Sequence, residues 1–465
     1  MMITRRQLLR DASLSFGALA FSAMLSESQA VSTPTDPLAP KPPHRPARAI
    51  SVVFLYMDGG VSQVDSFDPK LRLTQENGQP RPFEIDATVF NNNRDLLASP
   101  WTFKQYGESG IPVSSLFPHL GTVADELCVI RSMTAFSPSH PNANYALHTG
   151  NVRQGHASVG AWVTYGLGTE FDDLPGFVVI HGGQMPSGGK SVFGSGFLPA
   201  NYQGSLIQPE NPFLANLTPR SMRSGDQFRR LRYLRTFDQE LVDRIEDSAA
   251  IEAAIANHEL AFRMQSAVPE VFDISRESKT TQRQYGLEAG YENTRKYGRQ
   301  CLIARRLVER GVRFIELTIN PGNGDRWDQH GDLKRGHSRN ALAVDQPIAA
   351  LITDLKARGL LDTTLIVFAG EFGRTPFAQG RDGRDHNPQG FSVWMAGGGI
   401  RGGTIYGATD EYGYRAIENR LTVHDLHANM LYLLGIDHTR LTRRFGGRDV
   451  RLTDVHGRII PEIIA

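Results

Sequence analysis

The sequence of 465 residues has little cysteine, almost no net charge and no apolar run long enough to cross a membrane. Its two cysteines, Cys128 and Cys301, lie in apolar runs, so we expect buried thiols and not a disulfide scaffold. The 50 basic residues against 49 acidic ones leave a net charge of +1, which argues against nucleic acid or a membrane surface as a partner. The apolar run at residues 12–25 is shorter than the roughly 20 residues of a membrane span.

The N-terminal residues have the pattern of an export signal. Residues 4–10 read TRRQLLR, a twin-arginine pattern, and residues 28–30 (SQA) form a small-x-small cleavage signal. We therefore expect residues 1–30 to be a signal peptide for the twin-arginine export machinery, and the mature protein to be periplasmic or secreted. The alternative is an ordinary amphipathic helix. Residues 31–48, rich in proline, threonine and alanine, are typical of an extended linker.

The remaining residues, 49–465, are long enough for two domains but equally fit one large α/β domain. We expect strands at residues 50–57, 127–131, 174–181, 312–319, 363–369 and 391–395, and helices at 114–126, 341–358 and 423–434. Because strands alternate with helices, a doubly wound, mostly parallel sheet flanked by helices is predicted. Residues 71–112 are interpreted as surface loops, and residues 209–310 as a helical insertion.

Acidic and histidine side chains follow the ends of several predicted strands. Asp58 comes directly after the first strand and precedes two glycines, which allow a ligand to approach the backbone closely. Asp328 and His330 follow a later strand, and Glu371 follows the next one. His386 lies in the loop after Glu371. Strand ends are where ligands bind in open α/β sheets, and carboxylates and imidazoles bind divalent metals, so a metal centre for hydrolysis is predicted. For Asp58 alone, a turn-forming role is an equal alternative.

A second group of candidates lies in residues 137–150, SPSHPNANYALHTG. Ser139 or His140 would lie where a strand meets a helix, and the free N–H groups of a helix N-terminus favour an oxyanion there. Either residue is therefore a candidate nucleophile, whereas this stretch by itself favours a serine that only caps the helix. Asp65 and Asp68 are interpreted as turn and cap residues, and His337 as a surface residue.

Three motifs occur in order along the mature chain: DGGVSQVDSFDPK at residues 58–70, GEFGRTP at 370–376 and GRDH at 383–386. The ordered set resembles the alkaline phosphatase and sulfatase superfamily. It is most similar to a branch of twin-arginine-exported, sulfatase-like proteins known only as a domain of unknown function. The resemblance covers nearly the whole mature chain and implies an alkaline-phosphatase-like α/β fold.

The resemblance also implies one or two divalent ions, of zinc, calcium, magnesium or manganese. Asp58 matches an aspartate that holds one metal, and Glu371 matches the aspartate of an Asp-His ligand pair. Phe372 stands where that pair has its histidine, which removes one ligand and leaves one or two ions as alternatives.

A further ligand set follows from the same resemblance. Asp328 and His330 resemble a pair that the superfamily usually spaces four residues apart, whereas here the spacing is two. Asp325 is an alternative to Asp328 as the ligand. His386 matches the last histidine of the set.

The nucleophile that the resemblance implies is His140 or Ser139, depending on whether one residue is inserted before Gly150. The chain has no Cys-x-Pro-x-Arg sequence, which excludes the formylglycine chemistry of conventional sulfatases. Arg374, three residues after Glu371, would clamp the oxygens of an ester or form a structural ion pair with Glu371.

Together, the residues and the resemblance predict metal-assisted hydrolysis of a phosphate or sulfate ester in a small molecule or a glycan. Ser139, His140 or a water molecule would attack the ester, or His140 would act as a general acid. The alternative is a catalytically degenerate, exported protein that binds anionic glycans without turnover. Metal content and ester turnover distinguish the two.

Overall fold

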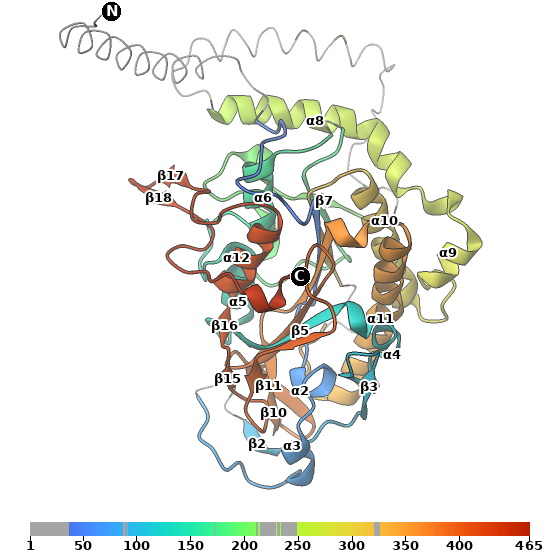
Figure 1. The fold of residues 1–465 in the computed structure, drawn as a ribbon, viewed down its shortest axis with the longest axis vertical. Helices are drawn as coiled ribbons and strands as arrows, with labels where there is room; N and C mark the ends of the chain where they lie inside the picture. The colour runs from blue at the N-terminus through green and yellow to red at the C-terminus, as the bar shows by residue number, and fades with distance from the viewer. Residues whose placement is uncertain are drawn as a thin grey trace, which may run out of the picture.

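One large sheet forms the centre of the molecule, and helices cover both of its faces (Figure 1). The computed structural model describes residues 37–86, 90, 92–171, 173–210, 213, 229, 233, 249–319 and 326–465. In chain order, the strands of the sheet are β1 Ser51–Tyr56, β5 Leu127–Thr134, β6 Phe177–Ile180, β7 Ser205–Ile207, β8 Phe314–Thr318, β9 Thr364–Ala369, β12 Phe391–Ala396, β13 Thr404–Tyr406 and β16 Leu421–Thr422. Across the sheet their order is β13-β5-β12-β9-β1-β8-β6-β7, and β16 pairs with β5.

The middle of the sheet is parallel. β1 lies between β8 and β9, and β6 lies between β8 and β7, all in parallel pairs. Every residue of β1, β8 and β9 is buried, as expected for mostly apolar strands covered on both faces. β12 runs antiparallel to its neighbours β9 and β5. The predicted α/β fold with a mostly parallel sheet is therefore confirmed.

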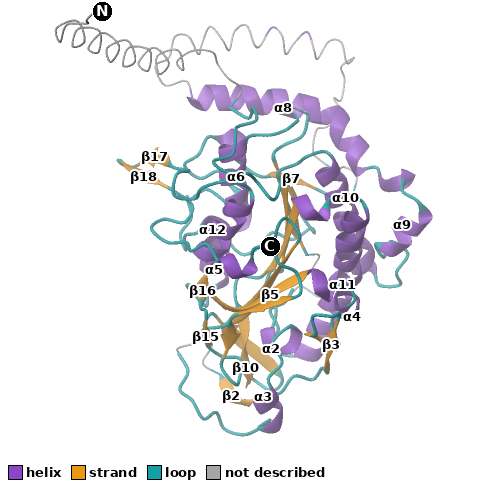
Figure 2. Cartoon of the chain, viewed as in Figure 1, coloured by secondary structure: helices purple, strands orange, loops and turns teal. Residues whose placement is uncertain are grey.

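Two sets of helices enclose the sheet (Figures 1 and 2). On one side lie α10 (Glu292–Glu309) and α11 (Leu333–Ala357). On the other side lie α5 (His140–Thr149), α6 (Val159–Leu167) and α12 (Val423–Leu433). Because a parallel strand must be followed by a crossover, helices such as α11, between β8 and β9, bring the chain back to the start of the next strand.

A hairpin of β10 (Gly373–Gln379) and β11 (Gly383–Asn387) follows the sheet strand β9, and β2 (Asn93–Leu96) pairs with β10. His386 therefore lies in a strand and not in a loop, which corrects the prediction from sequence. Residues 377–379 complete β10 and residues 380–382 form the turn of the hairpin, which brings Arg374 of the GEFGRTP motif opposite His386 of the GRDH motif.

Two local predictions are wrong. The segment predicted as surface loops contains α3 (Leu71–Gln75), β2, β3 (Phe103–Tyr106) and β4 (Ile111–Ser114), because short strands that pair with each other leave no long pattern. The helix predicted at residues 114–126 is reduced to α4 (Pro118–Gly121) and a 3₁₀ turn. Proline lacks a backbone N–H and is favoured in the first turn of a helix, which is where Pro118 lies, so α4 begins at Pro118 and not at residue 114.

The predicted linker is only partly described. Residues 37–48 form no helix or strand but follow the body of the protein, where Leu38 is buried. The backbone N–H groups of Lys41 and Arg48 donate to the carbonyls of Leu167 and Leu433. The predicted signal peptide lies outside the described residues.

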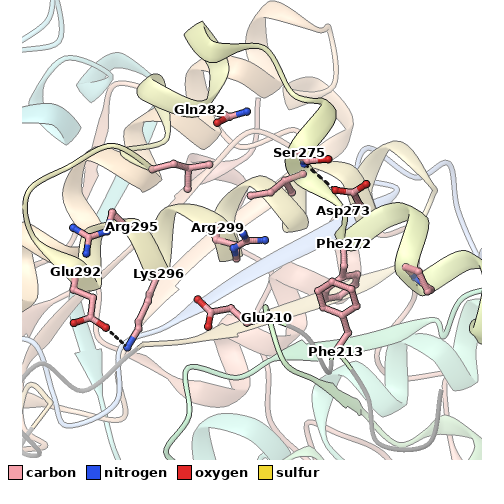
Figure 3. A pocket seen from close by; sticks show the side chains of 13 residues that line it. Glu210, Phe213, Phe272, Asp273, Ser275, Gln282, Glu292, Arg295, Lys296 and Arg299 are labelled. Atoms are coloured by element: carbon pink, nitrogen blue, oxygen red, sulfur yellow. Dashed lines mark hydrogen bonds and ion pairs between the residues drawn. The ribbon is translucent and has the colours of Figure 1, made fainter. Parts of the chain in front are cut away.

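The predicted insertion includes α8 (Ala249–Phe272), α9 (Lys279–Gln284) and α10. Of these, α10 belongs to the layer that covers the sheet: it leads into β8 and its Thr294 hydroxyl donates to a carbonyl of α11. These three helices enclose a cavity of about 870 Å³ (Figure 3). Charged side chains of α10 and two phenylalanines, Phe213 and Phe272, line it.

Both cysteines are buried free thiols, as the sequence predicts. Within the described part of the chain, no helix is both long and apolar enough to span a bilayer.

Candidate metal centre

The predicted ligands meet at one edge of the sheet. Asp58 follows β1 by two residues and Glu371 follows β9 by two, and the loop after β8 carries Asp328 and His330. Because β1, β8 and β9 are parallel neighbours, their carboxyl ends lie side by side. Helix α5 begins at the same edge with His140.

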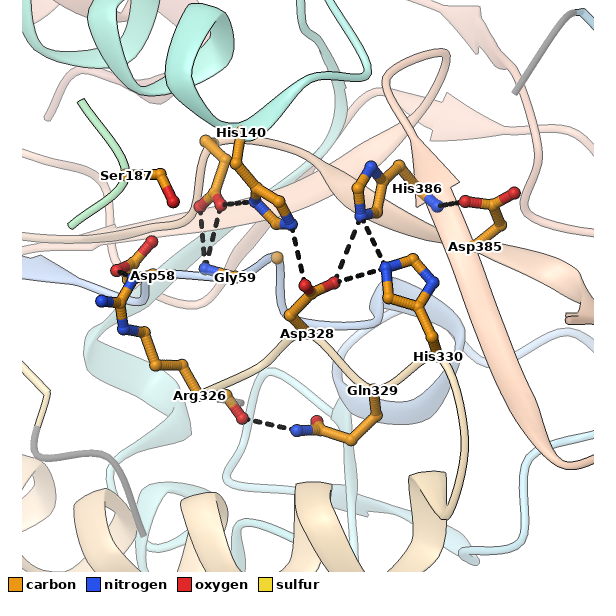
Figure 4. A network of polar contacts seen from close by, with 12 residues as sticks. Asp58, Gly59, His140, Ser187, Arg326, Asp328, Gln329, His330, Asp385 and His386 are labelled. Atoms are coloured by element: carbon orange, nitrogen blue, oxygen red, sulfur yellow. Dashed lines mark hydrogen bonds and ion pairs between the residues drawn. The ribbon is translucent and has the colours of Figure 1, made fainter. Parts of the chain in front are cut away.

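Four side chains form a compact group there, which we call the histidine–aspartate group: His140, Asp328, His330 and His386 (Figure 4). One ligand atom from each lies within 4.8 Å of all the others. His330 Nε2 lies 2.9 Å from Asp328 Oδ1 and 3.0 Å from His386 Nε2. His386 Nε2 lies 3.2 Å from Asp328 Oδ1, and His140 Nε2 lies 3.1 Å from Asp328 Oδ2. Three imidazoles thus surround one carboxylate.

The other ring nitrogen of each histidine faces an acceptor. His386 Nδ1 lies 2.6 Å from the Pro138 carbonyl, and His140 Nδ1 lies 2.6 Å from Glu371 Oε1. His330 Nδ1 contacts Gln379 Oε1. Each Nδ1 is therefore the donor, an arrangement that directs Nε2 towards the group and is typical of metal-binding histidines.

His386 shows most directly that these residues fit a cation. Burial lowers the pKa of His386 to about 4, although Asp328 opposes the shift, so the ring is neutral at pH 7. With its proton on Nδ1, Nε2 presents a lone pair to Asp328 Oδ1. Burial by itself would raise the pKa of Asp328, but Arg374 and the three histidines hold it far below the usual value. A lone pair thus faces a carboxylate oxygen, which a cation between them would stabilise.

The separations also fit an ion. Ligands at 2.0–2.1 Å around a tetrahedral zinc ion lie roughly 3.3 Å apart. The distances from Asp328 Oδ1 to His330 and His386, and between those two rings, are 2.9, 3.2 and 3.0 Å, within a few tenths of that value. Nitrogen and oxygen donors of this kind suit zinc and other first-row divalent metals.

Asp58 lies beside the histidine–aspartate group but outside it (Figure 4). Glu371 is also outside the group and contacts it through His140. The Tyr56 hydroxyl lies 2.8 Å from Asp58 Oδ1, and Arg326 pairs with Asp58 Oδ2. The Gly59 N–H lies 2.9 and 3.1 Å from the two oxygens of Glu371. Burial and the neighbouring Glu371 raise the pKa of Asp58 to about 6. Two buried carboxylates therefore stand next to the group, and their role as metal ligands stays a prediction.

Phe372 occupies the place next to Glu371 where the resembling superfamily has a histidine. Its ring centroid lies 4.6 Å from that of His386 and 4.8 Å from that of His140. The phenyl ring therefore packs against two members of the group and supplies no ligand atom.

Arg374 is completely buried, and its guanidinium contacts Asp328, not Glu371. Nη2 lies 2.5 Å from Asp328 Oδ1. Nε donates to the Gly60 carbonyl and Nη1 to the Arg384 carbonyl, both at 3.2 Å. The predicted clamp on an ester would thus require the guanidinium to leave these partners. The alternative pair with Glu371 is not formed.

Ser139 is the N-cap residue of α5, but its side chain makes no capping hydrogen bond. His140, the next residue, is the one whose ring reaches the histidine–aspartate group. Asp325, the alternative to Asp328, lies outside the described residues.

A buried polar layer supports the site, and it corrects two predictions. Asp65 is not a turn residue: it pairs with Arg384 at 2.7 Å, and neither side chain is exposed. His337 is buried and not on the surface, and burial lowers its pKa to about 3. Its Nε2 accepts from the Ser62 N–H at 3.2 Å, and its Nδ1 lies 2.6 Å from Gln329 Oε1. These polar side chains connect the first motif to the loop that carries Asp328.

Sequence reasoning missed Arg326 and Asn144. Arg326, two residues before Asp328, pairs with Asp58, and Asn144 contacts the hydroxyl of Tyr56. The spacing of Asn144, one helical turn after His140, is a signal that could have identified it.

Comparison with known protein families agrees with the family resemblance that the three motifs indicate. A family model described as "Protein of unknown function (DUF1501)" matches residues 49–464. The chain belongs to the DUF1501 family. No curated protein matches this family member.

This DUF1501 chain is also similar to several solved structures. The lipoteichoic acid synthase LtaP from Listeria monocytogenes shares 9% identity with a TM-score of 0.35, over 90% of this chain and 78% of that one. The PsFucS1 sulfatase from Pseudoalteromonas sp. shares 13% identity with a TM-score of 0.35, over 83% and 68%. The alkaline phosphatase from the Antarctic bacterium TAB5 shares 9% identity with a TM-score of 0.31, over 76% and 92%.

Proposed function

We propose that this chain is a metal-dependent hydrolase of phosphate or sulfate esters. The observation that carries the proposal is the position of His386 Nε2, 3.2 Å from Asp328 Oδ1, with His330 and His140 completing the set of donors. The four residues of the histidine–aspartate group would hold one divalent ion. Asp58 and Glu371 stay predicted ligands of a second ion beside it.

A bound divalent ion would polarise an oxygen of the ester and favour its attack by a nucleophile. The chain prepares the site for an anionic substrate in two ways. Arg326, 11% exposed, places a positive charge beside the group, and it would have to release Asp58 or the Met185 carbonyl to bind an ester oxygen directly. Glu371 holds Nδ1 of His140, so that Nε2 stays directed at the reacting centre. Nε2 has one role at a time: it binds the ion, or, with the ion held by Asp328, His330 and His386, it attacks the ester or passes a proton to its leaving oxygen.

Metal content tests the centre directly. We expect purified, leaderless protein to contain about one divalent ion per chain, or two if Asp58 and Glu371 hold another. Because His386→Ala removes Nε2, which contacts both Asp328 and His330, the variant should lose the ion. At a free metal concentration of 100 times Kd, binding should stabilise the fold by about 2.7 kcal/mol, measurable by thermal unfolding with and without chelator.

Two variants sharpen this experiment. Glu371→Ala should weaken binding of the ion, because the ring of His140 loses the carboxylate that orients it. His156→Ala should keep it, because His156 packs against Phe197 outside the group. If the wild-type protein contains no metal and His386→Ala has the same unfolding temperature as the wild type, the hydrolase proposal is wrong.

Turnover of phosphate and sulfate esters distinguishes the two predicted functions. Hydrolysis that disappears with chelator supports the enzyme. Tight binding of sulfated or phosphorylated glycans with no hydrolysis supports the alternative, a binding protein for anionic glycans.

We further propose that the protein acts outside the cytoplasm after twin-arginine export, on the basis of residues 4–10 and 28–30. Replacing both Arg5 and Arg6 with lysine should leave the protein in the cytoplasm. Unchanged export of that variant would contradict the proposal.

A further inference from the structure

Helix α5 carries three polar side chains on one face. His140, Asn144 and His148 are spaced four residues apart, so they lie in one stripe along the helix. His140 belongs to the histidine–aspartate group, whereas Asn144 and His148 are buried between the helix and the sheet. The stripe thus runs from the metal centre into the core.

The inner end of the stripe forms an ion pair with the sheet. His148 Nε2 lies 2.8 Å from Glu316 Oε1, and each side chain is 1% exposed. His148 Nδ1 lies 2.8 Å from the carbonyl of Asn144. Because both ring nitrogens face acceptors, the pair holds a proton on each nitrogen or shares one with the carboxyl of Glu316.

Glu316 is unusual for its position. It lies in the middle of β8, opposite Phe54 of β1 and Val179 of β6, in a run of apolar residues. Glutamate is uncommon in strands, and burying its charge is costly unless it is paired. A leucine or valine would fill a parallel strand at this point with no such requirement. The pair therefore contributes something to the fold other than the burial of apolar surface.

The middle of the stripe connects to the other carboxylate of the site. Asn144 contacts the hydroxyl of Tyr56, which also lies 2.8 Å from Asp58 Oδ1. The Asn144 amide donates at 2.9 Å to the Ser187 carbonyl. The ring of His148 packs edge-on against Tyr56 with centroids 4.7 Å apart. Successive turns of α5 are thus tied to strands β8 and β1.

We propose that Glu316 and His148 are a positioning pair for the metal centre, an inference that rests on the proposed function. The pair sets the rotation and depth of α5 on the sheet. Only in that placement does His140, two turns away, reach Asp328 and Glu371 at once.

The physical reason is directionality. Apolar contacts are non-directional, so an all-apolar face would let the helix turn or slide by a fraction of a residue at little cost. An ion pair with a second hydrogen bond to the Asn144 carbonyl defines one orientation. A buried polar pair retained for specificity and not for stability is known in other folds.

The decisive experiment replaces both partners, as Glu316→Leu with His148→Leu. Exchange of a buried ion pair for apolar residues of similar volume is often neutral or stabilising for a fold. We therefore expect an unfolding temperature at or above that of the wild type. Affinity for Co²⁺, read from its visible absorption, should nevertheless fall by about 10- to 100-fold, the usual effect of losing a residue that orients a ligand.

A conservative variant separates charge from placement. Glu316→Gln keeps a hydrogen bond, because a neutral His148 with its proton on Nδ1 accepts from the new amide. We expect this variant to bind Co²⁺ almost as the wild type does. Tyr285→Phe, which removes a buried 3.0 Å hydrogen bond to Asp354 of α11, is the control and should leave Co²⁺ binding unchanged.

Crystal structures of the wild type and the double leucine variant provide a readout independent of metal. A variant in which His140 Nδ1 stays within hydrogen-bond distance of Glu371 and Co²⁺ affinity is unchanged overturns the proposal. Absence of Co²⁺ binding in the wild type would overturn the metal centre, whereas the position of α5 in the variant would still decide the role of the pair.

Discussion

Replacing His140 with alanine is expected to lower ester turnover by about 10²- to 10⁴-fold, the range for loss of a positioned acid, base or nucleophile. His140 connects the two carboxylates of the site, at 2.6 Å from Glu371 and 3.1 Å from Asp328. Burial by itself would lower the pKa of His140, but those two carboxylates raise it to about 9. Its loss would leave Glu371 with the Gly59 N–H but without its imidazole partner, and would open one side of the histidine–aspartate group.

Ser139→Ala is the matched control. The serine is the N-cap residue of α5 and its side chain makes no capping hydrogen bond, so its removal should change neither turnover nor stability by much. Steady-state kinetics on the same ester, with metal content measured for each variant, compares the two. The reverse result, an inactive Ser139→Ala and an active His140→Ala, would identify the serine as the nucleophile and reject our assignment.

Replacing Asp65 with alanine is expected to lower the free energy of unfolding by about 3–5 kcal/mol, the usual cost of leaving one partner of a buried ion pair alone. Asp65 accepts from Nε and Nη2 of Arg384 at 2.7 and 3.1 Å, and both side chains are fully buried. Urea denaturation of the variant measures the effect. Asp449→Ala breaks the exposed pair with Arg444 and should change the unfolding free energy little.

The contribution of Asp65 should also depend on pH. Burial by itself would raise the pKa of Asp65, but Arg384 lowers it more, so the folded pKa lies below the unfolded value of about 3.9. A group with a depressed folded pKa stabilises the fold above its unfolded pKa and loses that effect as pH falls through the folded one. The difference between wild type and Asp65→Asn should thus be constant above about pH 4 and shrink below it. A difference that grows on acidification would contradict the pairing.

The apolar strands could be predicted because a strand covered on both faces is apolar along most of its length. β1 and β9 are such runs, and the residues just beyond them, Asp58 and Glu371, could therefore be placed at the same edge of the sheet. Short paired strands such as β3 and β4 could not be predicted, because a segment of four residues is too short to show a distinctive pattern.

The candidate site likewise contains residues that could be predicted from the sequence and residues that could not. The types of residue and the order of the motifs predicted a metal centre that includes Asp328, His330 and His386. The assignment of His140 to the same group required the packing of α5 against the sheet. Arg374 was predicted to contact Glu371 or an ester, but the strand that carries it directs the guanidinium towards Asp328.

By itself, then, the sequence determined the α/β class, the strand ends and most members of the histidine–aspartate group, since these depend on local patterns of apolar and polar residues. Only the tertiary structure decided which of those residues meet. Asp65 and Arg384 are separated by 319 positions, and His148 and Glu316 by 168, yet each pair is in direct contact. Contacts over such separations depend on how helices pack on the sheet, and no local pattern in the chain records that packing.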